Sequence, residues 1–178
     1  SGANLADTSA FSLVTSSNMS GTLAVEDGDL VLNVTSSGST VNDLVWGATI
    51  SPSDWDLTTD NWLNNGSPAI FASYDNAIFN GTDTAKEINV TENIYAGDVT
   101  FQADNATYTL TGEKLLGSNP ITIKGGTTLV IDGKGLDAQP LNIENGIVRM
   151  GTNVVASGNA LGALSAPITI GENGTFDL

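Results

Sequence analysis

The sequence contains no cysteine and no histidine, and only five of its 178 residues are lysine or arginine. The first two absences exclude disulfide bonds, thiolate nucleophiles, Cys/His zinc sites and imidazole bases. The five basic residues are outnumbered by 20 Asp and Glu residues, which gives a net charge of −15. Such an acidic surface repels phosphate backbones and anionic lipids, so we expect neither nucleic-acid binding nor membrane insertion of this segment.

Aromatic residues are also scarce, at 6%, and no hydrophobic run reaches the roughly 18 residues that a membrane-spanning helix needs. The hydrophobic fraction of 40% is nevertheless sufficient for a packed core. Apolar residues alternate with polar ones, as in the stretch 29–34, "DLVLNV", and helical periodicity is nearly absent. These features predict an all-β protein of short strands joined by tight turns.

A repeated pattern, an apolar-x-apolar triplet followed by a Gly/Asn/Glu turn, starts at residues 88, 108, 121, 141 and 168. Two of the gaps are 20 residues, close to the length of one solenoid coil. Stacked coils would bury the triplets together in columns, so we predict a parallel β-helix, with an antiparallel β-sandwich as the alternative. Asn145 and Asn173 are expected to stack at turns. Sharp turns, often with positive φ, are expected at Gly125, Gly126, Gly146, Gly171 and Gly174.

The stretch 41–81 differs in character, because it holds all three tryptophans and two of the five prolines. We expect it to form a Trp-rich opening segment or a cap over the end of the solenoid. Residues 1–40 are expected to be the closing strands of a preceding module, and 82–178 the β-solenoid coils. Both ends of the sequence are expected to be cuts through a longer protein.

The stretch "SGNALGALSAPITIGENGTFDL" (157–178) resembles the autotransporter-associated β-strand repeat, with its "NALG" turn at 159–162. "GGTTLVIDG" (125–133) is similar to the same repeat. The tryptophan-containing part of the chain is similar to the segments that open passenger modules of such proteins. The similarity lies in the order of its motifs, which are Trp46, Trp55, Asn61-Trp62, "DNAIF" (75–79) and "TLTG" (109–112). The resemblance implies a right-handed parallel β-helix, secretion, and an outer-membrane or cell-surface location in a Gram-negative bacterium. It implies no catalytic residue.

We therefore predict a structural passenger segment, a stalk or adhesin scaffold, that is not an enzyme and has no cofactor. Its expected partners are neighbouring modules of the same chain and host or matrix glycans or proteins. One alternative is a carbohydrate-binding adhesin module, in which Trp55, Trp62 and Tyr74 are the candidate binding residues because flat rings stack on sugar faces. A small aromatic core that pins this segment is the structural interpretation of the same tryptophans, and we favour it.

A second alternative is a polysaccharide-active β-helix enzyme. Asp54, Asp56 and Asp60 could supply an acid and a base, or oxygen ligands for Ca²⁺. Their spacing is not that of an EF-hand loop, and Asp is a common turn former, so we assign no metal site there.

Overall fold

The computed structural model describes residues 20–35, 40–51, 53–137, 139–152 and 166–178. These residues form strands and turns only, and they include no helix that could cross a membrane. The chain divides into two units, Ser1–Thr40 and Val41–Leu178. The described part of the first unit is an antiparallel hairpin of β1 (Ser20–Glu26) and β2 (Asp29–Thr35). Asp27 and Gly28 both have positive φ at its tip, as a tight hairpin turn requires.

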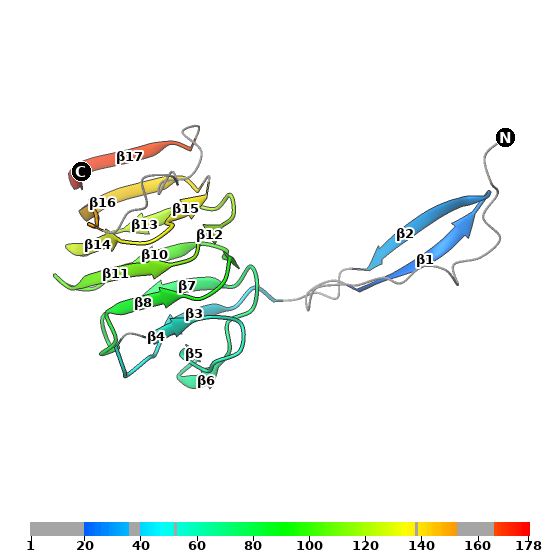
Figure 1. Ribbon diagram of the computed structural model, residues 1–178, viewed down its shortest axis with the longest axis horizontal. Coiled ribbons are helices and arrows are strands. Elements are labelled where there is room, and N and C mark those ends of the chain that lie inside the picture. The colour runs from blue at the N-terminus through cyan, green and yellow to red at the C-terminus, as the bar shows by residue number, and fades with distance from the viewer. Residues whose placement is uncertain (1–19, 36–39, 52, 138, 153–165) are drawn as a thin grey trace. The chain divides into compact units, whose positions relative to one another are not determined.

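The second unit contains a twelve-stranded sheet and a three-stranded sheet, and in Figure 1 β17 lies at one end of the stack of strands and β5 and β6 at the other. The large sheet is formed by β3 (Asp43–Trp46), β4 (Ser53–Trp55), β5 (Trp62–Asn64), β6 (Ser67–Ala69), β7 (Asn76–Phe79), β8 (Glu87–Val90), β10 (Val99–Phe101), β11 (Thr107–Gly112), β13 (Ile121–Ile123), β14 (Thr127–Ile131), β16 (Leu141–Met150) and β17 (Ile168–Asp177). The small sheet is formed by β9 (Ile94–Tyr95), β12 (Leu115–Leu116) and β15 (Leu136–Asp137).

The predicted all-β class is confirmed, but the large sheet is curled and mixed. Strands β5 and β6 pair antiparallel beside β3, within the Trp-rich segment, whereas the remaining strands of this sheet pair in parallel. The antiparallel part arises because Asn65 and Gly66, both at positive φ, reverse the chain directly between β5 and β6.

Equivalent apolar residues of successive parallel strands lie in register. Each step along the ladder β7, β10, β13, β16, β17 advances 20 to 27 residues in the sequence. One column of this ladder contains Ala77, Val99, Ile121, Leu141 and Ile168, and the next contains Phe79, Phe101, Ile123, Ile143 and Ile170. Most of these side chains are buried, whereas Ile168 and Ile170 on β17 are exposed because β17 pairs only with β16 in the described part of the chain.

Two further ladders complete the core. One contains the triplets that start at 88 and 108, and it aligns Ile88, Leu110, Ile131 and Met150. The other aligns Ile94, Leu115 and Leu136. The short gap of 13 residues in the sequence pattern therefore has a simple cause: the triplets that start at 108 and 121 belong to different ladders.

The glycines that were expected at turns fall into two groups. Gly125 and Gly126 have the expected positive φ, 67° and 73°. The expected turns at Gly146, Gly171 and Gly174 are wrong, because these glycines lie within β16 and β17 and have no positive φ. A Cβ at Gly146 would lie 2.5 Å from the carbonyl oxygen of Thr127, so this position requires glycine because stacked backbones approach closely. Asn145 and Asn173 pair in register as expected, but within β16 and β17 rather than at turns. The "NALG" turn at 159–162 and most of the expected closing strands before β1 lie outside the described residues.

The substitution Ile123→Ala tests the columns. Ile123 is fully buried, so we expect the free energy of unfolding to fall by about 2–5 kcal/mol, from lost burial and the cavity left behind. Ile50→Ala is the matched control, because Ile50 is 76% exposed, and we expect a change within about 0.5 kcal/mol. Urea unfolding followed by circular dichroism measures both. Equal effects of the two substitutions would contradict the assigned core.

Candidate functional site

The tryptophans form an aromatic cluster inside the second unit. Trp55 on β4 and Trp62 on β5 are fully buried, and their ring centroids lie 5.0 Å apart in an edge-to-face arrangement. Trp46 packs against Trp62 at 4.9 Å and donates its indole N–H to the carbonyl oxygen of Ala85. Neither Trp55 nor Trp62 presents a ring face to solvent, so neither can stack on a sugar in this structure. Their packing supports the interpretation of these residues as a small aromatic core.

The carboxylates of the same segment do not converge on one point. Asp54 Oδ1 accepts a hydrogen bond from Asn89, whereas Asp56 Oδ1 accepts from the backbone N–H groups and hydroxyls of Thr58 and Thr59. Partial burial raises the pKa of Asp56, but these hydrogen bonds outweigh it and hold the pKa below its ordinary value. Asp56 is thus a turn-forming residue. Across the described ranges, no three acidic side chains are grouped to hold a metal ion.

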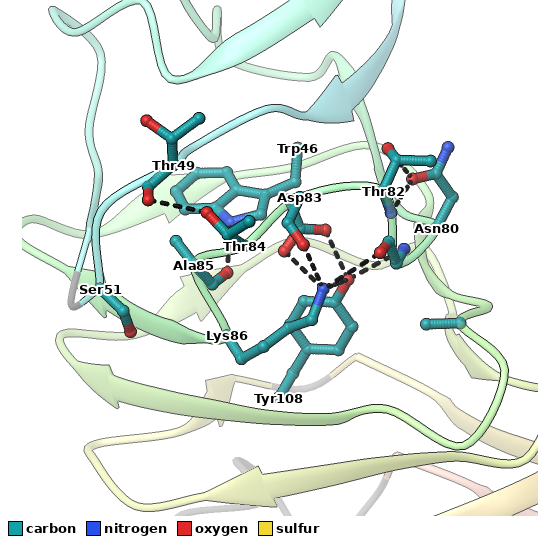
Figure 2. A network of polar contacts seen from close by, with 12 residues as sticks. Trp46, Thr49, Ser51, Asn80, Thr82, Asp83, Thr84, Ala85, Lys86 and Tyr108 are labelled. Atoms are coloured by element: carbon teal, nitrogen blue, oxygen red, sulfur yellow. Dashed lines mark hydrogen bonds and ion pairs between the residues drawn. The ribbon is translucent and has the colours of Figure 1, made fainter.

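A buried polar network lies nearby, formed by Asp83, Lys86 and Tyr108 (Figure 2). The Asp83 carboxylate accepts a hydrogen bond from the Tyr108 hydroxyl at 2.6 Å and an ion pair from Lys86 Nζ at 2.8 Å. The Tyr108 oxygen in turn accepts from the backbone N–H of Gly81 at 3.1 Å. The Asp83 side chain has no exposed area, and Lys86 is 30% exposed. The network therefore ties the connection between β7 and β8 to strand β11.

The electrostatics of this network do not favour a reactive tyrosine. Burial raises the pKa of Tyr108, and the hydrogen bond and negative charge of Asp83 raise it further, although the N–H of Gly81 lowers it somewhat. A tyrosine that acts as a base or nucleophile needs a lowered pKa. Tyr108 instead stays a neutral donor to a buried carboxylate. We interpret the network as a structural lock, in which every polar group has a partner.

Sequence reasoning did not single out these three residues. The pair Asp83 and Lys86 is separated by three positions, and Tyr108 occupies a buried position of an alternating strand. The sequence does not reveal that these residues meet, because it is the pairing of β8 with β11 that brings Tyr108 next to Asp83 and Lys86.

Tyr74, the third candidate binding residue, lies apart from the aromatic cluster. It is 52% exposed, and its ring centroid lies 5.9 Å from that of Tyr95 on β9. The two rings border a cavity of about 480 Å³ that is also lined by Leu116, Ser118, Asn119 and Asp137. We call this cavity the tyrosine groove. It is a concave surface that combines aromatic, aliphatic and hydrogen-bonding groups, which is typical of small-ligand sites.

The second unit is thus an all-β body with a curled mixed sheet, a buried polar lock and an open groove. No known protein family, no curated protein sequence and no solved structure matches the chain.

The variant Tyr108→Phe tests the polar lock through pH. The folded pKa of Tyr108 is raised above the value near 10 of an unfolded tyrosine. Its contribution to stability is therefore complete below pH 10 and is lost as pH rises further, by up to about 1.4 kcal/mol per unit. At neutral pH, we expect Tyr108→Phe to lower the free energy of unfolding by about 1–3 kcal/mol, because Asp83 loses a donor.

Urea unfolding between pH 7 and pH 11 measures both effects. The wild-type protein should lose stability above pH 10 more steeply than Tyr108→Phe does. Parallel pH profiles for the two proteins would contradict the assigned pKa direction.

Proposed function

We propose that the chain is a structural segment of a secreted or cell-surface autotransporter-like passenger, which acts as a stalk or adhesin scaffold. In this proposal the three ladders are the sides of a right-handed parallel β-helix, and each coil contributes one strand to each ladder. The observation that carries it is the in-register stacking of apolar residues at steps of 20 to 27 residues. The location at a Gram-negative surface rests on the sequence resemblance.

The ladders suit a mechanical role. Every parallel pair joins neighbouring coils through backbone hydrogen bonds, and the buried columns add a continuous apolar interior. A chain without cysteine can therefore resist unfolding outside the cell without disulfide bonds. Sequential stacking also allows coils to fold one after another as the chain emerges from the cell.

The Trp-rich segment suits a cap. Antiparallel strands β5 and β6 cover the open side of β3, where the parallel ladder would otherwise expose an edge. Two candidate residues of the carbohydrate-binding alternative, Trp55 and Trp62, give it no support, and the candidate carboxylate Asp56 gives none to the enzyme alternative. Trp55 and Trp62 are enclosed in the core, and Asp56 is committed to a local turn.

An in-frame deletion of residues 99–120 tests the coil architecture. It removes β10, β11 and β12 and brings Ile121 to the position of Val99, its register partner. We expect a folded, cooperative protein with a smaller free energy of unfolding, because a solenoid shortened by one coil keeps its ladders. Deletion of residues 99–109 alone is the control. It should prevent folding, because it removes part of a coil and the strands that follow can no longer lie in register in every ladder. Loss of folding in both variants would contradict the coil assignment.

Antibodies raised against residues 41–178 test the proposed location. We expect them to label intact cells of the source organism, and external protease should abolish the labelling while a cytoplasmic protein stays intact. Labelling that appears only after permeabilisation would contradict display at the surface.

A further inference from the structure

Tyr74 and Tyr95 stand out because they are exposed. They are the only aromatic residues of the described ranges with exposed side chains, at 52% and 46%. Their rings lie side by side with an interplanar angle of 39°. Exposed apolar rings in contact with one another are a feature of recognition surfaces rather than of a passive exterior.

The backbone of Tyr74 is strained to hold this position. Its φ is 73°, in the left-handed region that bulky residues rarely adopt. The conformation is imposed by its surroundings, since the Tyr74 N–H donates to the carbonyl oxygen of Tyr95 at 2.8 Å. The next residue, Asp75, is held in place because its buried carboxylate accepts hydrogen bonds from the backbone N–H groups of Asn42 and Ala72. Glycine would suit this turn without strain, so a tyrosine here indicates a use for its ring.

The tyrosine groove continues along the outward face of the small sheet. Tyr95, Leu116 and Asp137 are register partners on β9, β12 and β15, so their side chains form one row across three strands. Ser118 and Asn119 border the row, and Asn119 Nδ2 donates to Asp98 Oδ1 at 2.8 Å. The groove thus places flat apolar surface beside hydroxyl, amide and carboxylate groups.

This combination matches the chemistry of a pyranose ring, which has an apolar C–H face and a rim of hydroxyl groups. The cavity of about 480 Å³ lies within the usual range of small-ligand sites, roughly 300–1,000 Å³. Asp137 on the wall is ion-paired with Lys114 at 3.4 Å, so it is the net charge of −15 that disfavours uronates, sialates and sulfated sugars. We propose that the tyrosine groove binds a neutral oligosaccharide, whose rings stack on Tyr74 and Tyr95.

The proposal goes beyond a scaffold function, because it gives this segment a ligand of its own. It also differs from a site on the tryptophans, which are buried. Ser118, Asn119 and Asp137 would bind the sugar hydroxyls, and the two rings would supply the stacking energy. The proposed binding requires neither a metal ion nor a chemical step.

The test is a screen of the full chain against neutral glucan, mannan, galactan and N-acetylglucosamine oligosaccharides, with uronate and sialate glycans and a polyproline peptide as competitors. Isothermal titration then gives the dissociation constant for the strongest neutral ligand. We expect Tyr95→Ala and Tyr74→Gly to weaken binding at least about tenfold, and Tyr95→Phe to retain it, because the phenyl ring still stacks.

Thermal unfolding separates binding from folding. Tyr74→Gly relieves the strained φ, so its Tm should equal or exceed that of the wild type while its affinity is lost. Ile50→Ala, another exposed apolar residue, should leave affinity unchanged. The proposal would be overturned if the protein bound no neutral glycan, or if it preferred anionic glycans or the peptide. It would also be overturned if Tyr95→Ala and Tyr74→Gly both bound as tightly as the wild type.

Discussion

The second unit depends on one constraint: each parallel strand must place an apolar side chain directly on its counterpart in the neighbouring strand. Phe79 and Phe101 show this most clearly, with rings stacked at 4.3 Å and an interplanar angle of 6°. Ile123 and Ile143 continue the same column. Because side chains alternate across a strand, a slip of one residue would turn each apolar residue of a column toward the opposite face. A cysteine-free chain has no disulfide bond to prevent such a slip, so non-covalent contacts must prevent it.

Buried polar groups take over where the chain leaves the columns. The Thr127 hydroxyl donates to the Ala103 carbonyl and accepts from its N–H, both at 2.7 Å, and so replaces a missing backbone partner. Asp83 locks the connection before β8, and Asp75 fixes the turn that carries Tyr74. Buried side-chain hydrogen bonds therefore complete the fold and also shape the tyrosine groove.

The sequence predicted what periodicity can reveal. The triplets at 121, 141 and 168 lie in register in one parallel ladder, because buried strands repeat their apolar positions. Strands β5 and β6 escaped prediction, since three residues carry no readable period. Tyr74 was a candidate, but its partner Tyr95 was missed, because the two residues are 21 positions apart and meet through a backbone hydrogen bond outside any strand pairing.

The most direct test of the stacked ladders is a set of distances between spin labels attached to paired cysteine substitutions, which label specifically because the chain has no cysteine. Val45, Ile78, Thr100, Thr122, Asn142 and Thr169 occupy one register position. With Val45 as the reference, the distances to positions 122, 142 and 169 should be about 14, 19 and 24 Å, one strand spacing of about 4.8 Å per step. Distances that fail to increase in this order would contradict the account.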